Sequence, residues 1–243
     1  MALIYSFPKL TDNLLDKLEG ILHEKFDYPP LPKDYRDFLL LHNGGYVSPG
    51  YINDTEEYEH EEAIVFDTPL KWAKLNNKPV VPSLYQFYGA WLEDDMDENE
   101  VQNWDLFELV ASNNHSKHQH NVLPENMMSI AKCDHPDGDN MLCMSLDKDD
   151  YGSIYYYYGM YNYPAQFMGS YYVDQVEAIK KKYNIEDLDD LEDLEDMDDT
   201  DDMSPDSTIS KQIHKELTRV PFVKVAGSFQ EFLRIVRREK NND

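Results

Sequence analysis

Residues 31–45, LPKDYRDFLLLHNGG, predict a short helix whose two ends are both set by the sequence. Pro32 suits the first helical turn, where its missing N–H costs nothing. Gly44 and Gly45 offer the left-handed conformation that ends a helix. Tyr35, Phe38, Leu39 and His42 share one face of this helix, and we expect Tyr35, Phe38 and Leu39 to pack in the core. Because both ends of the helix are fixed, its apolar face can pack in the core while the Asn-Gly-Gly turn directs the chain toward the sheet.

Charge limits the partners that this chain can have. Its 243 residues hold 48 acids and 22 bases, a formal net charge of −26. A chain with so few cations repels nucleic acid and anionic membranes, because it cannot replace the counterions around phosphates. We therefore expect a basic protein partner, no nucleic acid and no membrane. The sequence does not indicate an oligomeric state.

Size and the lack of targeting signals predict one cytoplasmic domain. With 41% hydrophobic residues the chain can bury a core, and we expect a single domain over residues 1–243. The start, MALIYSFPKL, lacks a basic leader followed by an apolar segment, and about 18 uncharged apolar residues in a row occur nowhere. Both observations favour a cytoplasmic location.

An acidic run interrupts the globular pattern near the C-terminus. Thirteen acids and no bases lie between Glu186 and Asp206. Leucine or methionine recurs there at every third residue, but like charges at i and i+4 oppose an isolated helix. One interpretation is a solvated, flexible insert at about 186–207. The other is a segment that folds on a cationic partner.

Hydrophobic periodicity indicates helices at both ends of the chain and strands between them. Thr11 is a plausible N-cap, and Ser228 and Glu231 have the spacing of a capping box. We expect helices from Thr11, at 31–45, at 101–114, from Tyr171 and at 228–236. We expect strands at 63–66, 84–92, 127–133, 140–146, 152–158 and 222–225. Short turn-forming connections make the strands at 127–158 an antiparallel meander.

Tyrosine is concentrated in one region, with nine of the 18 tyrosines between Tyr151 and Tyr172. In a strand, Tyr155 and Tyr157 face one side and Tyr156 and Tyr158 the other. One pair packs in the core. The other pair lies on the outer face, where it is either covered by helices or serves as an anchor for a partner. We take Tyr156 and Tyr158 as the candidate anchors, with acidic groups that steer the partner at Glu93, Asp94, Asp95, Asp149 and Asp150.

The sequence contains no recognisable catalytic or metal-binding motif, so we expect no enzyme activity, cofactor or metal. His115, His118 and His120 lack a flanking carboxylate or Cys at ligand spacing, which favours a polar loop over a metal site. The segment DHPDGDN at 134–140 begins like a calcium loop but has Ser145 where a glutamate is needed. It is better explained as a hairpin turn. Two cysteines, Cys133 and Cys143, are too few for a disulfide scaffold.

The segment at 31–45 resembles the signature of the SUKH superfamily, which includes fungal cell-wall assembly regulators and bacterial immunity proteins that neutralise polymorphic toxins. The family pattern is a Leu-Pro pair, an aromatic residue and Phe-Leu on a short helix, then Asn-Gly-Gly. The matching residues are Leu31, Pro32, Tyr35, Phe38, Leu39, Asn43, Gly44 and Gly45. Further family-like motifs follow in order: QFYGAW (86–91), LPENMMSIAKCDHPDGDNMLCMSL (123–146), DDYGSIYYYY (149–158) and VAGSFQEFL (225–233).

The resemblance implies an α+β fold with a mixed, largely antiparallel central sheet packed by helices. It also implies a non-enzymatic module that acts by binding protein, with the motif at 31–45 defining the fold. The leading hypothesis is an immunity protein that binds and neutralises a basic, nuclease-type toxin. The alternative is a regulatory or scaffold protein of the cell-wall assembly regulator type. The stretches at 46–82 and 159–221 depart from the family pattern.

Overall fold

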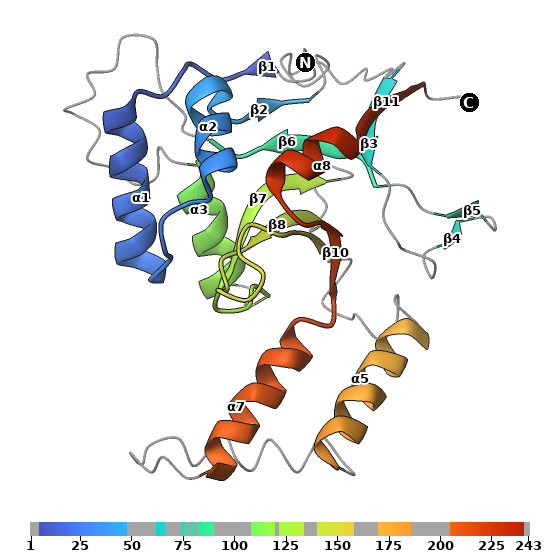
Figure 1. The fold of residues 1–243 in the computed structure, drawn as a ribbon. Helices are drawn as coiled ribbons and strands as arrows, with labels where there is room; N and C mark the ends of the chain where they lie inside the picture. Colours follow the sequence, from blue (N-terminus) through green and yellow to red (C-terminus); the bar gives the residue numbers. More distant parts are fainter. Residues whose placement is uncertain are drawn as a thin grey trace.

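A computed structural model describes most of the chain (Figure 1). The described residues are 5–47, 62–66, 74–75, 78–79, 82–89, 108–119, 122–133, 140–157, 170–185 and 205–240. Within them the fold is α+β, as expected, and every strand pairing is antiparallel. No helix in these ranges is both long enough and apolar enough to cross a bilayer.

The central sheet has seven strands in the order β1-β2-β6-β7-β8-β9-β10. Its strands are β1 (Tyr5–Ser6), β2 (Gly45–Tyr46), β6 (Leu84–Phe87), β7 (Met127–Cys133), β8 (Met141–Ser145), β9 (Ile154–Tyr157) and β10 (Phe222–Ala226). The predicted meander is confirmed, because β7 pairs with β8 and β8 with β9. Two small sheets lie outside it and consist of β11 (Val236–Lys240) with β3 (Glu62–Phe66) and β4 (Lys74–Leu75) with β5 (Lys78–Pro79).

Four helices pack on one face of the central sheet. They are α1 (Asp12–Phe26), α2 (Lys33–His42), α3 (Glu108–Asn114) and α8 (Phe229–Ile235). The predicted caps of two of them are present. The Thr11 hydroxyl accepts from the Leu14 N–H at 3.2 Å, and the Ser228 hydroxyl accepts from the Glu231 N–H at 3.1 Å. Pro32 is the N-cap of α2 rather than a residue of its first turn.

Two further helices, α5 (Ser170–Tyr183) and α7 (Pro205–Thr218), lie side by side at one end of the sheet (Figure 1). The last residues of α5 contact the last turn of α7: Lys182 Nζ and the Tyr183 hydroxyl each lie 2.7 Å from Glu216 Oε1. The helix α7 was not predicted from the sequence, where the acidic insert was expected to extend to 207. Ile209, Ile213 and Leu217 nevertheless recur every fourth residue, which is the spacing of a helix face.

The core is a chain of aromatic side chains contributed by motifs that are far apart in the sequence. Phe38 of α2 packs against Phe87 of β6 and Phe229 of α8, with ring centroids 5.0 and 4.9 Å apart. Phe232 continues the contact to Phe66, at 5.3 Å. Edge-to-face pairs at such distances stabilise a core beyond the area that they bury. Tyr35, Phe38 and Leu39 of α2 are buried, as predicted, whereas His42 on the same face is only partly buried.

The turn after α2 meets the end of β6 backbone to backbone. Asn43 and Gly44 both have positive φ, 50° and 72°. A methyl group at Gly44 would lie 2.6 Å from the Phe87 carbonyl oxygen, and one at Gly89 would lie 1.8 Å from the Asn43 carbonyl oxygen. No side chain fits at either glycine. The Asn-Gly-Gly motif after α2 and the Tyr-Gly motif at Tyr88 and Gly89 thus contact each other through their backbones.

Beyond the end of β6, side chains satisfy the free edge of β7. The Asn113 amide of α3 bonds both backbone groups of Ser129: its Nδ2 donates to the carbonyl at 2.8 Å and its Oδ1 accepts from the N–H at 2.9 Å. The Tyr28 hydroxyl donates to the Met127 carbonyl at 2.7 Å. The Leu109 N–H donates to the Gly89 carbonyl at 3.2 Å, which holds α3 next to the end of β6.

The opposite face of the sheet carries a smaller apolar cluster. Its buried members are Leu123, Met127, Met141, Cys143, Tyr157 and Phe222. Cys143 lies in this cluster, whereas Cys133 lies in the main core on the other face. Both cysteines are buried in strands and are not joined in a disulfide, as expected for reduced thiols.

Substitutions at the glycines test the backbone contact. We expect Gly44→Ala and Gly89→Ala each to lower the free energy of unfolding by about 3 kcal/mol, since neither site accepts a Cβ. The matched control is Gly20→Ala in α1, where an added Cβ meets nothing within 4 Å. That change should stabilise the fold by about 0.5–1 kcal/mol. Urea denaturation measures all three, and wild-type stability in Gly89→Ala would contradict the contact.

Two buried tyrosines provide a second test. The Tyr28 hydroxyl is hydrogen-bonded, whereas the Tyr35 hydroxyl has no partner among the described residues. We expect Tyr28→Phe to cost about 1–2 kcal/mol, because it leaves the buried Met127 carbonyl unpaired. Tyr35→Phe should leave the melting temperature unchanged or raise it. Equal losses in the two variants would disprove this assignment of the hydrogen bonds.

Candidate protein-binding surface

The turn between β8 and β9 is the part of the described chain that best combines exposed aromatic and acidic groups. It is a compact turn, closed by backbone bonds from the Gly152 N–H to the Ser145 carbonyl at 2.8 Å and from the Ser153 N–H to the Asp150 carbonyl at 3.0 Å. Gly152 adopts φ 82°, and a Cβ added there would lie 3.5 Å from the side chain of Pro32 in the Leu-Pro motif. The turn is thus held against the start of α2.

Tyr151 lies at the tip of this turn and is 42% exposed. Its hydroxyl donates to the carbonyl of Pro30, which is exposed on the neighbouring loop. Partial burial, together with the negative charges of Glu19 and Asp34, raises the pKa of Tyr151 above its usual value. The ring therefore presents a large apolar area in an acidic setting, which suits a cationic surface.

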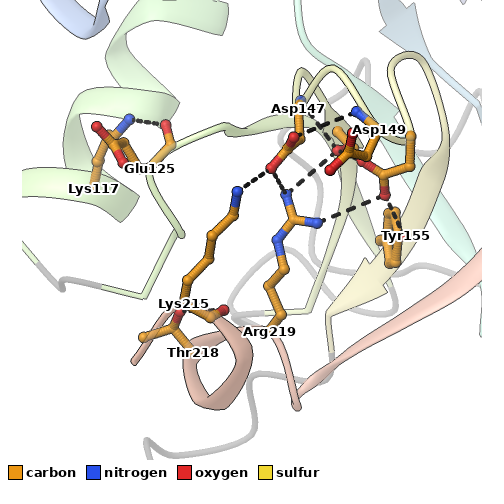
Figure 2. A network of polar contacts seen from close by, with 10 residues as sticks. Lys117, Glu125, Asp147, Asp149, Tyr155, Lys215, Thr218 and Arg219 are labelled. Carbon is orange, nitrogen blue, oxygen red and sulfur yellow. Dashed lines mark hydrogen bonds and ion pairs between the residues drawn. The ribbon is translucent and has the colours of Figure 1, made fainter. Parts of the chain in front are cut away.

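The other side of the turn faces α7 through a polar network (Figure 2). Asp147 pairs with Lys215 of α7, and its Oδ2 lies 3.5 Å from an Nη of Arg219. Arg219 also lies 3.7 Å from Asp150. Lys215 is the main cause that lowers the pKa of Asp147. We therefore expect this carboxylate to be charged at neutral pH.

Asp150 links the network to the sheet. It accepts hydrogen bonds from the Ser145 hydroxyl and, at 2.5 Å, from the Tyr155 hydroxyl of β9. Burial and the bond to Asp150 raise the pKa of Tyr155 well above its usual value. On this side of the turn the carboxylates of Asp147 and Asp150 are thus paired with Lys215 and Arg219. The exposed side chains of the turn are those of Lys148, Asp149 and Tyr151.

The residues proposed from the sequence as a binding site separate into three groups. Asp149 and Asp150 are brought together in the turn, Asp149 exposed and Asp150 turned inward. Tyr156 is fully buried and packs on Phe66 at 5.7 Å, so its expected place on the outer face is wrong. The pleat places Tyr156 toward the helices and Tyr155 away from them. Tyr158, Glu93, Asp94 and Asp95 lie outside the described residues.

The histidine-rich segment is not the predicted loop in its described part. Residues His115–Gln119 form a short π-helix that continues α3. His118 stacks on Phe26 at 5.8 Å, and Lys117 Nζ lies 4.6 Å from the centre of the Tyr28 ring. Lys117 also donates to the Glu125 carbonyl at 2.5 Å (Figure 2). These contacts fasten α3 to the end of α1. His120 lies outside the described ranges.

A partly buried acid that was not predicted from the sequence is Glu108, at the start of α3. Gln86 Nε2 donates to both of its carboxylate oxygens, at 2.7 and 2.8 Å. Burial nevertheless raises the pKa of Glu108 to about 7, against the partial compensation from Gln86 and Lys132. No motif marks this residue, because its burial depends on the packing of α3 against β6.

Glu108 predicts a pH dependence of stability. Its pKa is about 7 in the native state and near 4.5 in the unfolded chain, so the native state holds the proton more tightly. The free energy of unfolding contributed by this group is therefore full below pH 4.5 and is lost as the pH rises to about 7. We expect Glu108→Gln to reduce that loss. Urea denaturation of both proteins across this range measures the difference, and parallel curves would contradict it.

Comparison with known proteins identifies a family. The sequence model of the SMI1 / KNR4 family (SUKH-1) matches residues 9–235. No curated protein and no solved structure matches the chain. The matched span includes α2 with its Asn-Gly-Gly turn, the β7–β9 meander, and α8, which meet around the core described above. The chain therefore belongs to the SMI1 / KNR4 family (SUKH-1).

Proposed function

We propose that this chain is an immunity protein that binds and neutralises a basic, nuclease-type toxin domain without catalysing a reaction itself. Members of its family are generally non-enzymatic immunity or regulatory proteins that bind other proteins. The observation that carries the proposal is the surface around Tyr151. There an exposed aromatic ring lies among carboxylates on a chain of net charge −26.

Two kinds of residue at this surface affect different steps of binding. A tyrosine that becomes desolvated against a partner contributes mainly to the lifetime of the complex. Exposed carboxylates speed the encounter with a cationic protein by factors of about 10 to 1000. In this proposal Tyr151 replaces Tyr156 as the anchor, and Asp149 keeps the steering role expected from the sequence.

The test begins with the protein that the tagged chain retains from its own host. That partner is purified, and its toxic activity and its binding are measured with and without the chain. We expect a basic partner that loses its activity when bound. A basic partner without toxic activity would favour the regulatory role of the family instead. An acidic partner would overturn the proposal altogether.

Two substitutions give the expected kinetic pattern. Tyr151→Ala should raise the dissociation rate about tenfold or more with little effect on association. Asp149→Asn should slow association about two- to fivefold at low salt, and the difference should vanish near 0.5 M salt. The control, Glu24→Gln, removes an exposed acid from another face of α1 than Glu19. Equal effects of Asp149→Asn and Glu24→Gln would show that the turn is not the contact.

A further inference from the structure

The pair of helices α5 and α7 is joined to the rest of the fold in an unusual way. Val176 of α5 and Ile213 of α7 are buried, yet neither belongs to the main core or to the smaller apolar cluster. Among the described residues, these helices therefore bury their apolar side chains apart from the body. The Lys182–Glu216 ion pair and the Tyr183–Glu216 hydrogen bond also lie between the two helices.

The contacts from the end of α7 to the body are charged. Lys215 of α7 and Arg219, the residue after the helix, both reach Asp147 of the β8–β9 turn (Figure 2). Arg219 also lies 3.7 Å from Asp150 and 3.5 Å from the Ser145 hydroxyl. Cations in this position are further favoured by the negative end of the helix dipole. Lys215 is half exposed while the Asp147 side chain is 7% exposed, so the cations at the end of α7 lie over a carboxylate that is almost fully covered in their presence.

These cations cancel the charge of the turn. The turn itself carries the carboxylates of Asp147, Asp149 and Asp150 and only one base, Lys148. With Lys215 and Arg219 in place its formal charge is zero, and without them it carries two net negative charges. Moving α7 away therefore changes how the turn meets a charged partner.

We infer that Lys215 and Arg219 form an ionic latch that holds the α5–α7 pair on the β8–β9 turn and masks its carboxylates from cationic partners. When the latch opens, Asp147 and Asp150 lose their paired cations and add to the negative charge that Asp149 presents. A basic protein competes with α7 for the same carboxylates, so its binding and the release of α7 favour each other. The part that concerns a basic partner rests on the proposed function, whereas the latch itself does not.

The latch is tested first without any partner, by the distance between two spin labels. Gly20→Cys in α1 and Gln212→Cys in α7 supply the labelling sites, since a side chain at Gly20 meets no atom within 4 Å and Gln212 is exposed. The native cysteines are buried and stay unlabelled. We expect one narrow distance distribution in the otherwise native protein. Lys215→Ala with Arg219→Ala should broaden it and shift it to longer distances.

Lys182→Ala is the matched control. It removes a lysine of similar exposure, 55% against 50% for Lys215, but one that pairs with Glu216 inside the helix pair. This variant should keep the narrow distribution. The same distribution in all three proteins would overturn the latch. Cooperative thermal unfolding of each variant confirms that the body remains folded.

The masking is tested with a short oligoarginine peptide as the probe. Lys215→Ala and Lys182→Ala change the net charge of the chain equally, so general attraction affects both alike. If α7 masks the turn, Lys215→Ala should bind the peptide about three- to fivefold more tightly than Lys182→Ala, the size expected for one partly exposed ion pair. Equal affinities would refute the masking. A toxin partner that is never found would count against the proposed function alone.

Discussion

The fold depends on the contact between two backbone segments, the turn after α2 and the end of β6. Asn43 and Gly44 approach Phe87 and Gly89 so closely that neither glycine has room for a Cβ. This contact fixes α2 against the sheet, and the other motifs then meet α2 at separate points. Pro32 lies next to Gly152, Asp34 accepts from the Gln230 N–H at 2.9 Å, and Phe38 packs on Phe229. Motifs that are weak in isolation thus form one packing unit.

Local signals predicted most of the architecture. Capping residues, glycines and hydrophobic spacing act over a few residues, so α1, α2, α8 and the β7–β9 meander were predictable at nearly their observed positions. The sequence showed that alternate tyrosines of β9 face opposite ways, but it did not show which pair faces the helices. That choice depends on the pairing of β9 between β8 and β10. In the structure Tyr156 lies in the core, and Tyr155 is partly exposed.

The candidate site was less predictable, because its residues interact across long separations. Asp149 and Asp150 were identified as acids in a turn, but their roles differ through contacts that local sequence does not encode. Tyr151 gains its acidic surroundings from Glu19 and Asp34, and Asp150 is bonded by Tyr155 and approached by Arg219. The helix α7, which together with Arg219 after it supplies two cations, was hidden beside the acidic run. The sequence showed which residues are acidic, but it did not show which of these acids are paired with cations and which are exposed.

The side-chain pairing along β7 has a consequence for how the chain tolerates changes in length. Asn113 and Tyr28 supply hydrogen bonds to β7 beyond the end of β6, and the Gly89 carbonyl accepts from the Leu109 N–H. The two ends of the segment at 90–108 are therefore held together by the residues on either side of it. Lengthening a loop with fixed ends costs only about 0.6 kcal/mol of closure entropy for each doubling. Residues can thus be added between Gly89 and Leu109 at little cost in stability while the sheet keeps its register.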